Sequence, residues 1–261
     1  MRHRVSNEPR TEPDTLGPGA QARWDALKDA VGELAGAADD ADGFAAAFAA
    51  LRQIGQGVDL SEVVNALHVP EDADEHAEAL RRLLLRIPDG WGRWIGCSRG
   101  WYPILVELDE QLRALFPQYE LQQVKEKYGG LRFYWSEDEP ITDPADPEPD
   151  VPSLSEQATE AEKDAAWGAW EAAHDAWSQR LAYYLETEEG AAREQSFERR
   201  LKLAEQLVEA AERRASITCE LCSLPGESCC TPGPYPWYQT LCVGCAGQRG
   251  FVPSNQRDAS S

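Results

Sequence analysis

Apolar residues recur at helical spacing through the first third of the chain. Between residues 21 and 90 they stand three or four positions apart in several short runs. The first run consists of Trp24, Leu27, Val31 and Leu34. This period places apolar side chains on one face of a helix. The last run ends before Pro88, because proline cannot continue a helix interior. The pattern predicts a region of several short helices.

The middle of the chain changes from a helical period to an alternating one. A helix is predicted from about Pro103 to Phe116, since proline is favourable in the first helical turn. Residues 119–136 then alternate between apolar and polar around Gly129-Gly130, which indicates a β-hairpin. If these two glycines form the loop, Tyr128 faces Leu131 across the strands.

The two faces of this predicted hairpin differ in chemistry. The apolar face, which includes Val124, Phe133 and Trp135, is expected to pack on the preceding helix. The other face carries Lys125, Lys127, Arg132 and Tyr134. Cations beside an aromatic ring can hold a phosphate backbone with a stacked base. A charged strand face that meets only solvent is the alternative.

A second helical pattern occupies residues 157–216. Its first seam has residues alternately three and four positions apart: Trp167, Trp170, His174, Trp177, Leu181 and Tyr184. A matching seam follows Gly190: Phe197, Leu201, Ala204, Val208, Ala211 and Ala215. Two such seams predict an antiparallel helical hairpin with the tryptophans in its core. The alternative is an exposed recognition stripe, since Trp is enriched at interfaces.

The charge of the chain limits the classes of binding partner that it favours. Its 261 residues include 25 Lys and Arg against 46 Asp and Glu, a formal net charge of −21 at pH 7. Phosphates repel a uniformly acidic surface, so broad binding to nucleic acid is disfavoured. The acidity is concentrated in residues 21–90 and 136–195, whereas residues 91–135 are close to neutral. Acidic blocks of this kind add solubility, attract a basic partner or imitate a polyanion.

Two Cys-x-x-Cys pairs lie near the C-terminus: Cys219 with Cys222, and Cys242 with Cys245. Their separation is typical of a zinc ribbon. Four thiolates supply the tetrahedral shell that Zn²⁺ prefers and leave no open position for catalysis, so the predicted zinc is structural. The remaining cysteines are interpreted as a buried thiol, Cys97, and two spare thiols on a loop, Cys229 and Cys230.

Together these patterns predict an α+β, mostly helical protein. In it a helix packs on a β-hairpin and an antiparallel helical hairpin leads into a C-terminal zinc ribbon. The predicted segments are a disordered tail (1–20), an acidic helical region (21–90), the helix with the β-hairpin (91–136), an acidic proline-rich linker (137–156), the helical hairpin (157–216), the zinc ribbon (217–252) and a frayed tail (253–261).

Several motifs stand out within residues 101–135 and 196–252. They are Gly100-Trp101-Tyr102-Pro103-Ile104, Gln123-Val-Lys-Glu-Lys-Tyr-Gly-Gly-Leu-Arg-Phe-Tyr134, Ser216 through Cys222 with Pro225-Gly226, and Trp237-Tyr238 with Thr240-Leu-Cys-Val-Gly-Cys245. Together they resemble an uncharacterised family of proteins encoded by bacteriophages, prophages and bacteria. The resemblance implies a small α/β unit with a zinc knuckle and a phage or prophage origin. Relative to that family, residues 137–195 look like an insertion and residues 1–90 like an added helical region.

Signatures of the common enzyme classes are missing from the sequence. The four histidines, at positions 3, 68, 76 and 174, lie away from the predicted ribbon, so a zinc-associated nuclease would lack its base. There is no Walker loop and no G-x-S-x-G elbow. No apolar run follows the basic residues 1–4, and none is long enough to span a bilayer. We therefore expect no signal peptide, no membrane partner and a cytoplasmic location.

These observations leave three hypotheses for function. The leading one is a non-enzymatic zinc-ribbon protein, related to phages or prophages, that binds another protein, and its acidity favours a basic partner. The second is a nucleic-acid-binding module that uses the hairpin face and the ribbon. The third is an enzyme of unknown chemistry, which no group of residues in the sequence supports.

Overall fold

The structure is a computed structural model that describes residues 64–137, 142–143, 145–155, 157–233 and 235–257. The predicted tail 1–20 and most of the predicted helical region 21–90 lie outside these residues. The described chain forms two compact units, one comprising residues 137–206 and the other combining residues 64–136 with 207–257. Each unit is described by itself. More of the described residues lie in helices than in strands, and the predicted α+β class is confirmed.

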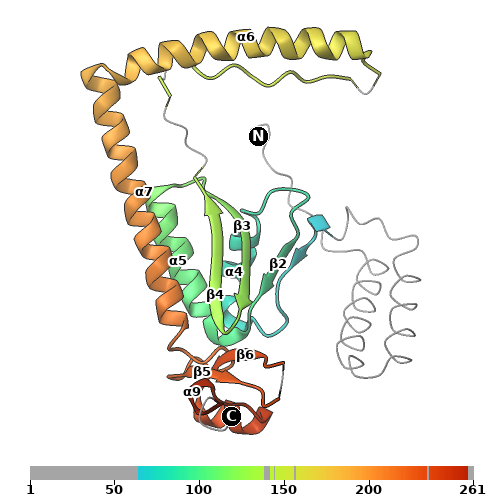
Figure 1. Ribbon diagram of the computed structural model, residues 1–261, viewed down its shortest axis with the longest axis vertical. Coiled ribbons are helices and arrows are strands. Elements are labelled where there is room, and N and C mark those ends of the chain that lie inside the picture. The colour runs from blue at the N-terminus through green and yellow to red at the C-terminus, as the bar shows by residue number, and fades with distance from the viewer. Residues whose placement is uncertain (1–63, 138–141, 144, 156, 234, 258–261) are drawn as a thin grey trace. The chain divides into compact units, whose positions relative to one another are not determined.

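Four strands form the larger sheet of the second unit, in the order β1-β2-β3-β4 (Figure 1). They are β1 (Leu67–His68), β2 (Arg93–Gly96), β3 (Glu120–Lys127) and β4 (Gly130–Ser136). The first three are parallel, and β4 runs antiparallel to β3. Parallel neighbours need crossover connections. Helix α4 (Ala77–Leu84) lies between β1 and β2, and α5 (Tyr102–Leu115) between β2 and β3; the 3₁₀ turns η1 (Asp74–His76) and η2 (Arg99–Trp101) precede them.

Helices α4 and α5 cover one face of this sheet (Figure 1). Pro103 lies in the first turn of α5, as predicted. The apolar side chains between helices and sheet are almost fully buried: Leu80, Leu83, Leu84, Leu105, Leu108, Leu112, Leu121, Val124, Leu131 and Phe133. The predicted packing of a helix on the apolar hairpin face is therefore confirmed.

A buried polar cluster ties the two helices to β3. Asp109 of α5 is 3% exposed. It accepts hydrogen bonds from Arg86 Nε and from the Tyr119 hydroxyl, both at 2.8 Å. The guanidinium of Arg86 lies 4.3 Å from the centre of the Tyr119 ring. Each buried polar group thus has a partner, which removes the cost of leaving it unsatisfied.

The hairpin turn lies one residue earlier than the sequence suggests. Tyr128 and Gly129 form the loop, with φ of +55° and +78°, and Lys127 pairs with Gly130. Two consecutive positive φ angles define a type I′ turn, whose twist matches that of the strands. The predicted pairing of Tyr128 with Leu131 is therefore wrong. Because the pairing shifts by two positions, strand residues keep their predicted faces, while Tyr128 becomes an exposed turn residue.

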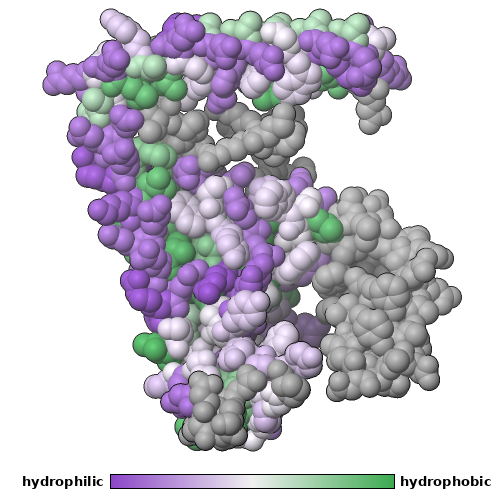
Figure 2. All heavy atoms as spheres, in the orientation of Figure 1, coloured by the Kyte–Doolittle hydropathy of each residue, from purple (hydrophilic) through white to green (hydrophobic). Residues whose placement is uncertain are grey.

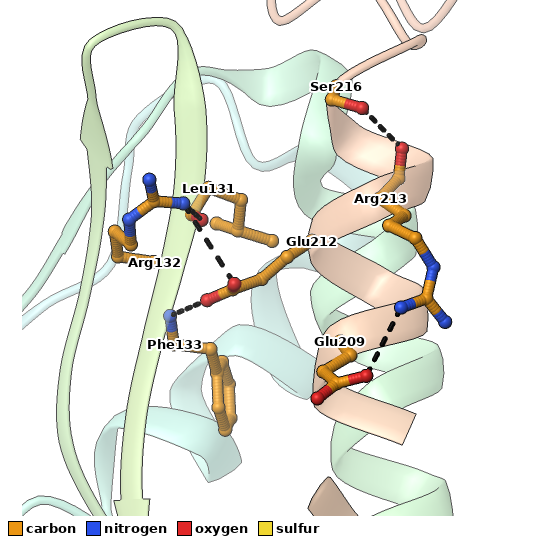
Figure 3. A network of polar contacts seen from close by, with 7 residues as sticks. All are labelled: Leu131, Arg132, Phe133, Glu209, Glu212, Arg213 and Ser216. Carbon is orange, nitrogen blue, oxygen red and sulfur yellow. Dashed lines mark hydrogen bonds and ion pairs between the residues drawn. The ribbon is translucent and has the colours of Figure 1, made fainter. Parts of the chain in front are cut away.

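Helix α7 (Glu188–Ala215) protects the edge strand β4. Its Glu212 accepts a hydrogen bond from the backbone N–H of Phe133 at 3.2 Å and lies 3.9 Å from the Arg132 guanidinium (Figure 3). On the same helix Arg213 pairs with Glu209, and hydrophilic residues cover much of α7 (Figure 2). Covering an edge in this way prevents it from pairing with another chain.

The unit formed by residues 137–206 contains α6 (Glu160–Leu185) and the start of α7. Helix α6 begins with a capping box in which Thr159 and Glu162 bond each other's backbone N–H. The chain turns between the helices at Glu186 and Thr187, and Gly190 lies inside α7. A Cβ at Gly190 would lie 2.1 Å from the Tyr184 carbonyl oxygen, so glycine permits a close backbone approach there.

The aromatic seam of α6 contacts the proline-rich segment that precedes the helix. The indole N–H of Trp170 donates to the Pro149 carbonyl at 3.2 Å, and that of Trp177 donates to the Asp146 carbonyl at 2.9 Å. The segment runs extended along α6 (Figure 1). Both predicted long helices are present, but this segment, rather than α7, covers the seam, because its carbonyls satisfy the indole donors.

A second, smaller sheet forms the C-terminal part of the second unit. Its strands are β5 (Glu227–Cys230), β6 (Tyr238–Leu241) and β7 (Val252–Pro253), in the order β6-β5-β7. Helix α8 (Val243–Arg249) follows β6, and the short helix α9 (Ser254–Arg257) lies within the predicted frayed tail. The first Cys-x-x-Cys pair precedes β5 in the chain, and the second directly follows β6. We call residues 217–252 the ribbon.

Candidate metal centre

The first Cys-x-x-Cys pair lies in a tight turn after α7. The N–H of Cys219 donates to the Leu224 carbonyl at 2.7 Å, and the N–H of Ser223 donates to the Cys219 carbonyl at 3.0 Å. Ser223 adopts the left-handed conformation, with φ of +61°. These bonds close the turn around Cys222 and bring its thiol beside that of Cys219.

The second pair lies at the start of α8. Cys242 is the N-cap residue, and its sulfur accepts a hydrogen bond from the backbone N–H of Cys245 at 3.4 Å. This bond lowers the pKa of the Cys242 thiol to about 7. Burial, together with the neighbouring thiols, raises the pKa of Cys245 to about 12. Because neighbouring thiolates repel one another, all four thiols can lose their protons together only when a cation lies among them.

The four sulfur atoms form one compact cluster. The Sγ atoms of Cys219, Cys222, Cys242 and Cys245 all lie within 4.8 Å of one another. Cys222 Sγ is 3.6 Å from both Cys242 Sγ and Cys245 Sγ. Tetrahedral Zn²⁺ with Zn–S bonds of about 2.3 Å would separate its sulfurs by roughly 3.8 Å. The spacing fits, and the four clustered cysteines could hold a metal ion such as Zn²⁺.

The interior of the ribbon is small. One buried cluster occupies it: Cys219, Cys229, Leu241 and Ala246. Cys222, Cys242 and Cys245 pack against this cluster with Leu221 and Phe251. So few apolar side chains provide little hydrophobic stabilisation. Domains of this kind commonly depend on a metal for folding.

Cys229 and Cys230 lie in strand β5, which corrects their interpretation as spare thiols on a loop. Both are buried, at 2% and 0% exposure. Cys229 belongs to the interior of the ribbon, and its Sγ is 4.0 Å from the Leu241 carbonyl. Neither residue belongs to the four-cysteine cluster. Adjacent strand residues point to opposite faces, so the two thiols cannot serve one metal together.

A buried carboxylate attaches the ribbon to the α/β core. Glu220, between the first two cysteines, is 2% exposed. It accepts hydrogen bonds from the N–H and the hydroxyl of Ser98 and from the Gln239 amide, at 3.1–3.2 Å. Burial raises its pKa. In the sequence, only the position of Glu220 between two cysteines distinguishes it from the other acidic residues, so no pattern predicts its role.

Two glycines allow the ribbon to approach the core closely. A Cβ at Gly100 would lie 2.2 Å from the Cys219 carbonyl oxygen. The N–H of Gly100 donates to the Glu220 carbonyl at 2.7 Å. At the hairpin turn, the Gly129 carbonyl accepts a hydrogen bond of 2.6 Å from the Thr240 hydroxyl. The motif segments that are far apart in the sequence therefore meet at this junction.

The second predicted site lies on the sheet face opposite α4 and α5. Lys125 pairs with Arg132 in the hairpin, and its Nζ lies 5.4 Å from the centre of the Tyr134 ring. Lys127 stands beside the turn, with its Nζ 5.5 Å from the Tyr128 ring. The structure thus gathers the four predicted residues, while Glu212 partly compensates the charge of Arg132.

Comparisons with other proteins add no relative. No protein-family model matches the chain, and no significant match is found among curated proteins or solved structures. The resemblance to phage, prophage and bacterial proteins therefore stays a prediction, apart from the four-cysteine cluster that it shares. Among the described residues, none of the helices has the length and apolar character needed to cross a bilayer.

Proposed function

We propose that this chain is a non-enzymatic protein that binds another protein through a ribbon held by structural zinc. The observation that carries the proposal is the set of large apolar side chains that the ribbon leaves in solvent. They are Ile217, Leu224, Tyr235, Trp237 and Val243, with exposures of 58–94%. Such side chains on a small, rigid element are typical of partner-binding surfaces.

The proposed role of zinc is structural because four thiolates would fill its coordination shell. When bound, the ion would supply cross-linking of the two turns and no open position for a substrate. Cys219 and Cys222 would hold it from one turn, Cys242 and Cys245 from the other. The exposed Leu224 and Val243 stand directly beside these turns, so zinc would fix the apolar surface.

The charge of the chain supports a basic partner. A net charge of −21 raises the rate at which a cationic protein approaches and disfavours acidic ones. The apolar ribbon surface would then provide most of the affinity, since exposed charges contribute mainly to association rates. Because the motif segments resemble phage, prophage and bacterial proteins, a bacterial lysate is the suitable source of partners.

The test is an affinity capture from bacterial lysate after nuclease treatment, with the bound proteins identified by mass spectrometry. The wild type is compared with Leu224→Ser/Val243→Ser, which removes apolar surface and keeps all four cysteines. We expect the double variant to retain zinc and lose the stoichiometric partner. The matched control is Tyr183→Ser, an exposed apolar position in the other unit. Capture that survives in the zinc-loaded double variant contradicts the proposal.

A further inference from the structure

We infer that the sheet face opposite α4 and α5 binds single-stranded nucleic acid. This inference goes beyond the proposed function, because it concerns a different surface and a different ligand. We call this surface the open sheet face. Its residues come from β2, β3 and β4: Trp94, Gly96, Gln123, Lys125, Lys127, Arg132 and Tyr134. Both aromatic side chains are solvent-accessible, at 38% for Trp94 and 41% for Tyr134.

A row of cations crosses the open sheet face. Lys125 of β3 pairs with Gly96 of β2 on one side and with Arg132 of β4 on the other. Lys127 follows on the same face of β3. A Cβ at Gly96 would lie 3.2 Å from the Lys125 Cβ, so β2 carries no side chain beside the lysine at this position and approaches it closely. Cations in this arrangement can contact successive phosphates.

A row of aromatic residues lies next to the cations. Gln123 pairs with Tyr134, and the β2–β3 register continues to bring Trp94 beside Gln123. Neighbouring strands are about 4.8 Å apart, so the two aromatic residues stand roughly 10 Å apart. A Cβ at Gly92 would lie 2.1 Å from the Trp94 ring, which shows that the indole lies against this glycine. Glycine therefore allows the indole to pack against the backbone there while Trp94 stays 38% exposed to solvent, where a base can reach it.

The two rows together select the ligand. Bases stack on aromatic rings irrespective of sequence, and phosphates follow the cations. A duplex keeps its bases stacked inside, so only a single strand can use both rows. Neither row contains an acidic residue; Glu120 stands at the far end of β3 and Glu212 at the edge of β4. Acidic residues dominate the chain as a whole, which would confine phosphates to this face.

The test measures binding of a fluorescent oligo(dT) of about 12 nucleotides to the full chain by anisotropy, at several salt concentrations. We expect Trp94→Ala and Tyr134→Ala each to weaken binding at least about fivefold, the effect of losing one stacked base. Three phosphate contacts predict a log–log salt slope of about −2. Lys125→Gln/Arg132→Gln should bring the slope to roughly −0.7.

Two controls accompany these variants. Tyr183→Ala removes an exposed ring and Lys202→Gln an exposed cation elsewhere, and both should bind like the wild type. Failure of the full chain to bind at low salt would overturn the inference. Equal binding of duplex DNA, or affinity unchanged by loss of either ring, would also overturn it. Displacement by an acidic peptide that needs the cations and not the rings would assign the face to a protein instead.

Discussion

The α/β core and the ribbon belong to one unit of the chain, yet different interactions stabilise them. The core buries large side chains such as Leu108, Val124 and Phe133 between two helices and a sheet. Among the described residues of the ribbon, the interior cluster contains just Leu241 and Ala246 besides Cys219 and Cys229, and the other three thiols of the four-cysteine cluster pack against it. The hydrophobic effect stabilises the first, whereas the second has a small apolar interior and four thiols that could hold a metal ion. Each part should therefore respond to a different perturbation.

Loss of the metal ligands should have the largest effect. We expect Cys219→Ser/Cys222→Ser to reduce zinc from one ion per chain to none and to unfold the ribbon. Structural zinc provides an apparent binding free energy of about 10–16 kcal/mol at neutral pH. Hydrogen exchange should show loss of protection in β5 and β6 and retained protection in β3 and β4.

The control for this variant is Cys229→Ala, which removes a buried thiol that lies outside the cluster. It should keep one zinc per chain. The distinction between the two parts fails if β3 and β4 lose protection together with the ribbon, because the core would then depend on the metal as well.

Truncation of a buried side chain in the core should destabilise the core and leave the zinc content of the ribbon unchanged. Leu108 is 1% exposed, and Leu108→Ala should lower the free energy of unfolding of the core by about 2–5 kcal/mol, because it leaves a cavity. Denaturant unfolding followed by circular dichroism measures the loss. Zinc content should not change. The exposed Leu203→Ala is the control, and a loss of zinc in Leu108→Ala alone would show that the ribbon needs an intact core.

The two parts also differ in how far the sequence predicts them. Side-chain alternation correctly predicts the faces of the hairpin, because a period of two is insensitive to a shift of two positions. It does not predict the register, since a type I′ turn can place a non-glycine residue such as Tyr128 at positive φ. Cysteine spacing predicts the cluster because two short turns are enough to gather four thiols.

The sequence does not predict the contacts between segments that lie far apart in the chain. The heptad seam of α6 indicates an apolar face, but any element with free carbonyls can satisfy Trp170 and Trp177. Glu220 gives no periodic or compositional signal, because its role depends on Ser98 and Gln239 reaching it from other strands and turns. The residues that join the ribbon to the core therefore appear only in three dimensions.

The junction between core and ribbon can be tested through Gly100. Gly100→Ala would place a Cβ 2.2 Å from the Cys219 carbonyl oxygen, so the two segments must separate. We expect a loss of about 1–3 kcal/mol, the usual cost of overpacking, with zinc content kept. Gly244→Ala is the matched control, since nothing lies within 4 Å of its added Cβ. If the two variants are equally stable in thermal unfolding, the close backbone approach at Gly100 does not contribute to the stability of the junction.

The smallest effect is expected at the second contact of the junction. The Thr240 hydroxyl is buried and donates to the Gly129 carbonyl at 2.6 Å. Thr240→Val keeps the shape and removes the donor, so the carbonyl loses its partner at a cost of about 1–3 kcal/mol, and we expect the lower end because one bond is lost. Hydrogen exchange at the hairpin turn should increase, while β5 and the cysteine cluster stay protected.

Thr240→Ser separates the hydrogen bond from the packing of the methyl group. Serine retains the hydroxyl. The Thr240→Ser variant should therefore keep slow hydrogen exchange at the turn, and it should retain most of the stability that the Thr240→Val variant loses. If serine destabilises as much as valine, the methyl group joins the two parts, and the hydrogen bond does not. If neither substitution has an effect, the contacts at Gly100, Glu220 and Trp101 hold the junction without help from the Thr240 hydroxyl.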